Sequence, residues 1–153
     1  YRDDKGIRIE AYDIAHMAGK DMVGVMVVFR GSELEKSSYR KFTIKGFEGS
    51  NDPRALKEVL ERRFAHSEWT MPDLIVVDGS TAQKNVALQT LLSHKKTIPV
   101  VGVVKDEKHR PVRIIGPKKL IDEHKSAILH ANAESHRFAI TFHTQKRNKS
   151  FLA

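Results

Sequence analysis

Cysteine is absent from the 153 residues of this sequence. Its absence excludes a disulfide-stabilised scaffold, a thiolate zinc site, an iron–sulfur cluster and a cysteine nucleophile. Any metal ion must therefore be held by oxygen or imidazole ligands. Long apolar runs are also absent, because a stretch such as residues 22–29 is far shorter than the ~20 residues of a membrane-spanning helix. No signal-peptide pattern follows Tyr1, so we expect a cytoplasmic protein that does not enter a membrane.

The composition is that of a single soluble globular domain. Hydrophobic residues make up 40% and charged residues 30% of the chain, and a chain of this length buries about two-thirds of its surface on folding. We therefore expect one domain over residues 1–153. Because the chain begins with Tyr1 rather than Met, we also expect it to be a piece of a longer multidomain protein, monomeric as it stands.

Positive charge is in excess, with 27 Lys and Arg against 19 Asp and Glu, a formal net charge of +8. Residues 101–153 hold 11 basic and 5 acidic side chains, whereas residues 1–100 hold 16 and 14. A cationic surface attracts polyanions, so nucleic acid is the first partner to consider. Charge alone is a weak signal, since many basic domains are merely soluble.

The first half of the sequence predicts three consecutive strands. Residues 7–14 alternate apolar and polar side chains, residues 22–29 are apolar and rich in β-branched side chains, and residues 38–44 alternate again. The short connections between them predict an antiparallel arrangement. After Asp52-Pro53 the apolar residues recur with helical spacing, which predicts an amphipathic helix of about 14 residues.

The second half predicts a βαβ unit and a closing helix. Residues 74–77 and 98–104 are continuous apolar runs typical of strands buried on both faces, and residues 81–92 between them predict a helix. Such strands are usually parallel. Residues 112–115 are compatible with a further short strand, and residues 125–146 predict the last helix. The fold class is therefore α/β, a mixed five-stranded sheet of three antiparallel strands and then two parallel ones, with flanking helices.

Two acids stand at the ends of predicted core strands, Asp13 and Asp78. Burial of a carboxylate is costly unless a cation or hydrogen bonds compensate its charge. In α/β sheets, ligands collect at the carboxyl ends of the strands, so two such acids favour a site for Mg²⁺ or Mn²⁺. Taken singly, each Asp could equally be a helix cap or a turn former.

Other candidate side chains are less specific on their own. A lone helical histidine such as His136 is usually a surface or structural residue. Lys105 follows the second apolar strand of the βαβ unit, where it could bind a phosphate or attract the carboxylates, although most such lysines are simply solvated. The candidates for contacts with a nucleic-acid backbone are basic or aromatic residues on the third strand, near the strand ends, in the last helix and in the short basic tail at the end of the chain: Tyr39, Arg40, Lys41, Lys105, Arg137, Lys146 and Arg147.

Taken together, several segments resemble one family, the C-terminal endonuclease domain of UvrC, the incision subunit of bacterial nucleotide excision repair. The similarity runs from about Ile7 to Arg147 in the same order and with similar spacing, and it is strongest in the early Asp, the VDG segment and the HRFAI segment. The matching segments are residues 9–16 (IEAYDIAH), 39–42 (YRKF), 72–79 (PDLIVVDG), Gln83, 101–106 (VGVVKD) and 136–140 (HRFAI).

The resemblance implies a ribonuclease H-like fold with an Asp–Asp–His metal site. The family's two catalytic carboxylates fall on Asp13 and Asp78, and its histidine falls on His136. The implied activity is metal-dependent hydrolysis of damaged duplex DNA on the 5′ side of a lesion, with Mg²⁺ or Mn²⁺ as cofactor. The family's whole protein also carries an N-terminal nuclease for the 3′ cut, a segment that docks the UvrB subunit, and helix-hairpin-helix motifs, none of which occurs in this sequence.

The sequence departs from the family pattern at two places. Ser80 stands where the family usually has a second glycine after its Asp-Gly. The family's usual Arg-Asp-Glu-Ala before the histidine is replaced by residues 132–135 (NAES), so an acid near the site is missing at Ala133. The three proposed ligands are intact, and we therefore still expect a metal site.

Two other function classes remain open at this stage. The chain could be a catalytically inactive ribonuclease H-like module that binds DNA or acts as a scaffold, in which the acids only cap elements. It could also be a phosphoacceptor receiver domain, because acids at two strand ends and Lys105 on a later strand imitate that site. Receivers begin with alternating strands and helices, so three consecutive strands argue against this class.

Overall fold

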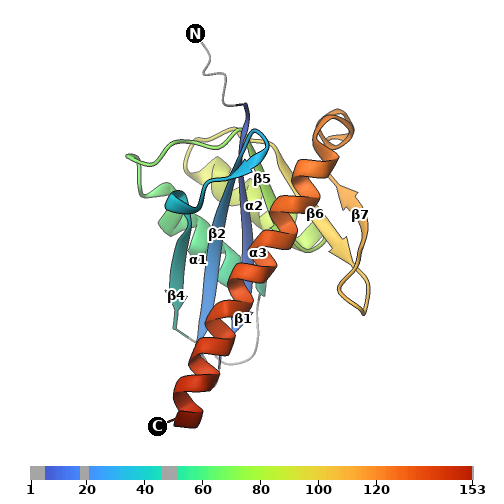
Figure 1. Cartoon of the computed structure of the whole chain (residues 1–153). Helices are drawn as coiled ribbons and strands as arrows, with labels where there is room; N and C mark the ends of the chain where they lie inside the picture. The colour runs from blue at the N-terminus through green and yellow to red at the C-terminus, as the bar shows by residue number, and fades with distance from the viewer. Residues whose placement is uncertain (1–5, 18–20, 46–51, 153) are drawn as a thin grey trace.

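The computed structural model describes residues 6–17, 21–45 and 52–152, without the side chains of residues 143–152. One mixed sheet forms the middle layer, with α3 across one face and α1 and α2 on the other (Figure 1). Hydrogen-bonded neighbours follow the order β3-β2-β1-β5-β6-β7, and β4 also pairs with β2. Among the described residues, no helix combines the length and apolar character needed to cross a bilayer.

The antiparallel part of the sheet comes from the first third of the chain. It consists of β1 (Arg8–His16), β2 (Met22–Arg30), the two-residue β3 (Glu33–Leu34), a single 3₁₀ turn η1 (Lys36–Ser38) and β4 (Arg40–Ile44). β2 pairs with β1, β3 and β4, antiparallel in each case. β2 is buried along almost its full length, which explains its continuous apolar sequence.

The parallel part follows after the first helix. Its elements are α1 (Asp52–Phe64), β5 (Leu74–Asp78), α2 (Thr81–Ser93), β6 (Val100–Lys105) and β7 (Pro111–Ile115). β5 lies parallel between β1 and β6, while β7 returns antiparallel along β6 as an edge strand. The βαβ unit predicted from the two apolar runs is therefore present.

The last helix, α3 (Lys118–Leu152), crosses the sheet and is kinked at His124, where φ is −125° and ψ is 20°. The helix predicted from residue 125 corresponds to the segment after this kink. The residues before the kink, KKLIDEH, carry too few apolar side chains for a helical period to be visible in the sequence. α3 covers β1 and β2 and reaches the strands beyond them (Figure 1).

Two apolar cores hold the layers together. One lies between the sheet and helices α1 and α2 and includes Met26, Leu60 and Val77; the other lies between the sheet and α3 and includes Ile9, Val76 and Ile128. Alternate side chains of β1 and β5 therefore belong to different cores. This division decides which strand residues face α3.

The predicted fold class is confirmed: the sheet is mixed, and its first three long strands are antiparallel. It has two short strands more than the predicted five, namely β3 and β7. β3 is too short to give a periodic pattern, and β7 is the short strand with which residues 112–115 were compatible. The antiparallel start excludes a receiver domain, whose doubly wound sheet alternates strands and helices.

Candidate active site

Strand periodicity places the two acids on the face covered by α3. Ala11 of β1 and Val76 of β5 are paired in the parallel register, and both belong to the core beneath α3. Asp13 and Asp78 follow two residues later on their strands, so they point to the same face at the same level. The alternation of side chains that directs Ala11 and Val76 into the core beneath α3 thus also brings the two carboxylates together at the border of that core.

Asp13 is the more buried of the two acids, with a side chain only 9% exposed. Its pKa is raised from 3.8 to about 7, chiefly by burial and secondly by the negative charge of Asp78. Its Oδ1 accepts the backbone N–H of Ile14 at 2.8 Å. This carboxyl therefore favours an added positive charge, either a proton or a cation.

Asp78 is held by two donors at the same oxygen. Lys105 Nζ lies 2.8 Å from Asp78 Oδ1, and the Asn132 side-chain amide donates to that oxygen at 3.2 Å. Lys105 ends β6, the strand beside β5, and Asn132 is an almost fully buried residue of α3. The turn after Asp78 lies directly against β6, because a Cβ on Gly102 of that strand would lie 2.7 Å from the carbonyl oxygen of Gly79.

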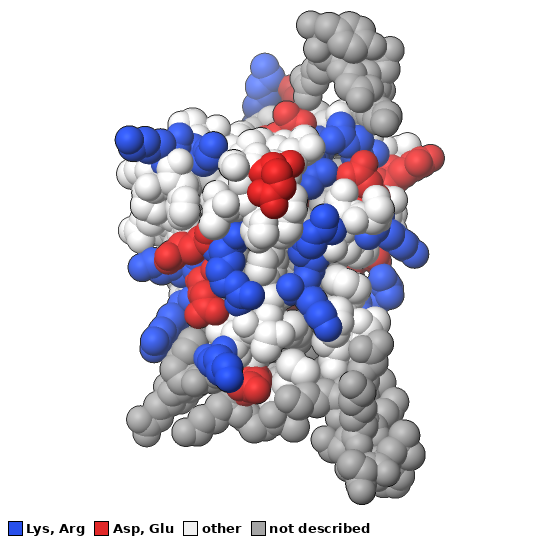
Figure 2. Space-filling model, turned by 90° about the vertical axis from the view of Figure 1, so that its left-hand side faces the viewer, with Lys and Arg blue, Asp and Glu red and all other residues white. Residues whose placement is uncertain are grey.

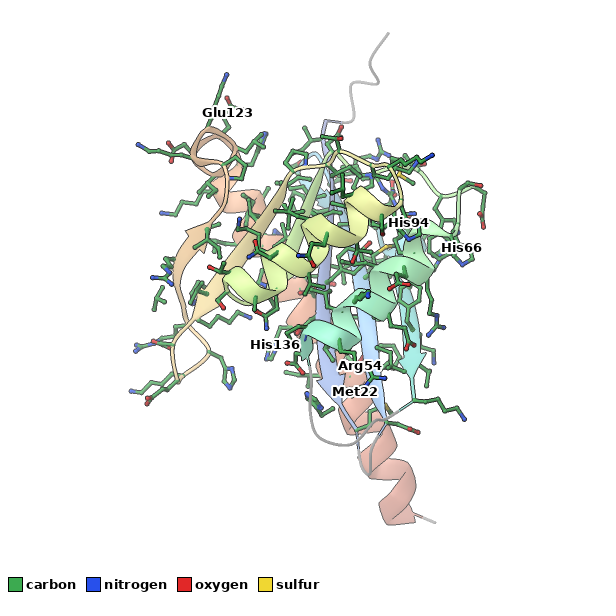
Figure 3. All side chains as sticks on the ribbon, turned by 180° about the vertical axis from the view of Figure 1, so that it is seen from behind. Met22, Arg54, His66, His94, Glu123 and His136 are labelled. Atoms are coloured by element: carbon green, nitrogen blue, oxygen red, sulfur yellow. The ribbon has the colours of Figure 1, made fainter. Side chains whose placement is uncertain are left out.

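His136 reaches the acids from α3, one helical turn after Asn132. Its Nδ1 lies 3.2 Å from Asp13 Oδ2, and its side chain is 38% exposed. Figure 3 shows His136 at the end of the sheet where α2 begins. The structure thus brings Asp13 of one strand next to Asp78 of the neighbouring strand and next to His136 of the helix.

The two carboxylates suit a hard divalent cation such as Mg²⁺ or Mn²⁺. Neutral imidazole is a poorer ligand of Mg²⁺ than a carboxylate is, so the histidine favours Mn²⁺. Within the part of the chain that the structure describes, no three His, Asp or Glu side chains stand close enough to share an ion as they are arranged. The ammonium of Lys105 instead supplies a positive charge at Asp78. The raised pKa of Asp13 fits a site that gains a cation when loaded.

Comparisons with known proteins agree on one family. Residues 3–140 match the model of the UvrC RNAse H endonuclease domain. The chain belongs to this family. Over 97% of its length it is 42% identical to UvrABC system protein C of Thermoanaerobacter pseudethanolicus, and over 98% it is 38% identical to the protein of that name from Clostridium perfringens. The chain spans 28% of the length of each of these relatives.

The backbone of this UvrC-type domain is also similar to a solved structure of Endonuclease V from Ciona intestinalis in complex with DNA. The TM-score is 0.51 and the identity 13%, with 80% of this chain and 56% of that chain covered. At so low an identity the likeness shows the fold alone. It supports the ribonuclease H-like fold that the UvrC resemblance implies.

Two of the residues predicted to contact nucleic acid, Tyr39 and Arg137, bind the same carboxylate of this UvrC-type domain, that of Glu134 on α3. The Tyr39 hydroxyl donates to Glu134 Oε2 at 2.7 Å, and Arg137 donates to both oxygens of Glu134 at 2.6 and 2.8 Å. Burial, with the carboxylate of Glu134 close by, raises the pKa of Tyr39. The Tyr39 hydroxyl therefore faces the protein, whereas the Arg137 side chain is half exposed.

Arg40 and Lys41 lie on β4. Figure 2 views the molecule from the side on which Figure 1 shows β4, and on that face blue Lys and Arg atoms cover more surface than red Asp and Glu atoms. The guanidinium of Arg40 lies 4.8 Å from the ring centre of Trp69, and the ammonium of Lys41 lies 5.1 Å from that of Phe142. The side chains of Lys146 and Arg147 are outside the described residues. All of these contacts with nucleic acid stay predictions.

Two residues of the site were missed in the sequence. Asn132 could have been found, because it stands four residues before His136 and so on the same side of a helix. His109, in the β6–β7 turn, stacks on His136 with ring centres 5.8 Å apart. Nothing in its sequence context signals this contact, which depends on how the hairpin folds back over the site.

Without metal, the stability of the domain should fall as the pH rises from about 4 to about 7. The folded chain keeps a proton on Asp13, whose pKa is about 7, after the unfolded chain has lost it near 3.8. This group alone contributes a slope of up to about −1.4 kcal/mol per pH unit. This slope is measured by urea unfolding of the unchanged chain and of Asp13→Asn, in EDTA at several pH values. An equal pH dependence in both proteins would contradict the raised pKa.

Proposed function

We propose that this chain is a divalent-metal-dependent endodeoxyribonuclease domain that hydrolyses a phosphodiester on the 5′ side of a DNA lesion in nucleotide excision repair. The observation that carries the proposal is that Asp13 lies beside Asp78 and 3.2 Å from His136, at the carboxyl ends of two neighbouring parallel strands. Membership of the UvrC endonuclease family supports the choice of DNA as substrate.

Asp13, Asp78 and His136 would hold Mg²⁺ or Mn²⁺, which when bound stabilises charge on a phosphoryl group and makes water more acidic. Asp13 keeps the ring of His136 in place through Nδ1. Lys105 and Asn132 hold one oxygen of Asp78 and so fix the direction in which its carboxylate points. The expected products carry a 3′-hydroxyl and a 5′-phosphate.

Basic side chains would hold the DNA backbone without reading bases, since phosphate contacts carry no sequence information directly. Recognition of the lesion would then come from partner proteins. The relatives are named as components of the UvrABC system, and this chain spans 28% of their length. We propose that a UvrB-type subunit binds other parts of the whole protein, and that the chain by itself is monomeric.

Nicking of a supercoiled plasmid tests the activity. We expect nicked circles in Mn²⁺ or Mg²⁺, no nicking in EDTA, and product ends that a DNA ligase can reseal. Recovery after EDTA is removed and Mn²⁺ restored separates metal dependence from loss of folding. DNA binding without nicking in either metal would instead support the inactive, DNA-binding module of the same fold.

A further inference from the structure

The β6–β7 turn places a second imidazole against the site. His109 and His136 lie with ring centres 5.8 Å apart and ring planes inclined by 24°. This is within the range of offset aromatic stacking. We propose that His109 is a positioning residue, which fixes the plane of the His136 ring beside the carboxylate of Asp13. The proposal rests on the metal-binding role proposed for His136.

The turn that carries His109 is closed by hydrogen bonds to Asp106. Asp106 Oδ1 accepts the backbone N–H groups of Lys108 and Arg110, both at 2.9 Å, and Asp106 Oδ2 accepts Arg110 Nε at 2.9 Å. Backbone bonds from Asp106 to Arg110 and from His109 to Asp106 complete it. A turn fixed at this many points can hold a side chain in a defined position.

His109 has a left-handed backbone conformation, with φ at 62°. A residue other than glycine is uncommon there, although Asn, Asp and His tolerate it better than most. Unfavourable backbone conformations that persist in folded proteins cluster at functional sites. The side chain of His109 reaches α3, where its ring stacks on that of His136.

His136 needs a second restraint because its side chain is 38% exposed and its bond to Asp13 joins a single ring atom. One hydrogen bond fixes the position of Nδ1 but leaves the ring plane free to tilt. A contact with the ring face removes that freedom. β6 and the turn after it contact two residues of the site. Lys105, the last residue of β6, binds Asp78, and His109 in the turn stacks on His136.

A direct contact between His109 and a DNA phosphate is the competing explanation, because His109 is exposed and Lys108 and Arg110 are its neighbours. Two substitutions separate the explanations. His109→Phe keeps a ring that can stack but has no N–H donor. His109→Asn keeps a donor, tolerates a positive φ, and loses the ring.

The probe is Mn²⁺ alone, with the free ion measured by electron paramagnetic resonance. We expect His109→Asn to weaken Mn²⁺ binding by roughly tenfold, as for other residues that orient metal ligands, and His109→Phe to stay within about threefold of the unchanged chain. Nicking should follow the same order. His94→Asn is the matched control. The rings of His94 and Phe64 have their centres 6.1 Å apart, and His94 lies well away from His136 in Figure 3.

Unchanged Mn²⁺ affinity in His109→Asn would overturn the inference, as would unchanged nicking by His109→Asn. Thermal melting of each variant identifies any loss of folding. The metal-free chain provides a separate readout, since we expect a nuclear Overhauser effect between the two imidazoles, and its absence would also overturn the inference. If the unchanged chain bound no Mn²⁺, the proposed function would fail, and the ring contact would be judged on this effect alone.

Discussion

Replacement of Asp78 by Asn is expected to reduce plasmid nicking by roughly a thousandfold or more. A bound metal ion contributes several kcal/mol of charge stabilisation to the transition state, and each 1.36 kcal/mol corresponds to a tenfold change in rate. The substitution keeps the size of the side chain but removes its charge. Asp13→Asn should have an effect of the same order, because Asp13 lies beside Asp78 and would hold the same ion.

Glu123→Gln is the matched control for both variants, because Glu123 is half exposed on α3 and its carboxylate faces His124 at 3.7 Å. Figure 3 shows it at the far end of the molecule from His136. Nicking by Asp78→Asn within threefold of the unchanged chain would show that the assignment of the site is wrong. In the whole protein with its partner proteins, the same variant should lose the 5′ cut and keep the 3′ cut, which tests the side of incision.

Replacement of Glu10 by Gln is expected to lower the free energy of unfolding by about 3–5 kcal/mol. Glu10 of β1 and Arg63 of α1 have fully buried side chains and form two hydrogen bonds of 2.8 Å. Arg8 and the Tyr12 hydroxyl donate to the same carboxylate. If the carboxylate of Glu10 lost its charge, the buried guanidinium groups of Arg8 and Arg63 would lose the negative charge that they share.

Urea unfolding at neutral pH measures this loss, which is a large part of the 5–15 kcal/mol that typically holds a domain together. Glu58→Gln is the control, since Glu58 pairs with Arg62 at the surface and such pairs contribute about 0.5 kcal/mol or less. The double variant Glu10→Gln, Arg63→Met should be more stable than Glu10→Gln alone. A double variant that is less stable would contradict the view that unpaired charge causes the loss.

Much of the fold could be predicted from the sequence because its signals are local. The apolar runs of β2, β5 and β6 and the helical spacing in α1 are visible without knowledge of the rest of the chain, and these elements are buried in the structure. The first turns of α3 could not be predicted, because they are mostly polar. Nor could β3, whose two residues form a strand only because β2 offers a free edge to them.

The site was accessible to sequence analysis only in part. The positions of Asp13 and Asp78 at the ends of apolar strands carry a physical signal, whereas His136 was selected through the family resemblance. The bond from Tyr39 to Glu134 joins residues 95 apart in the chain, and the stacking of His109 on His136 depends on a hairpin turn. Such contacts are consequences of tertiary structure, and no periodic pattern encodes them.

The order in which the elements follow one another has a consequence for synthesis of the protein. Asp13 and Asp78 belong to the sheet, but the imidazole that would complete the centre is on the final helix. A nascent chain on the ribosome that has reached residue 120 contains Asp13 and Asp78 but does not yet contain His136. Competence to cut DNA would therefore arise only after almost the whole domain has been translated.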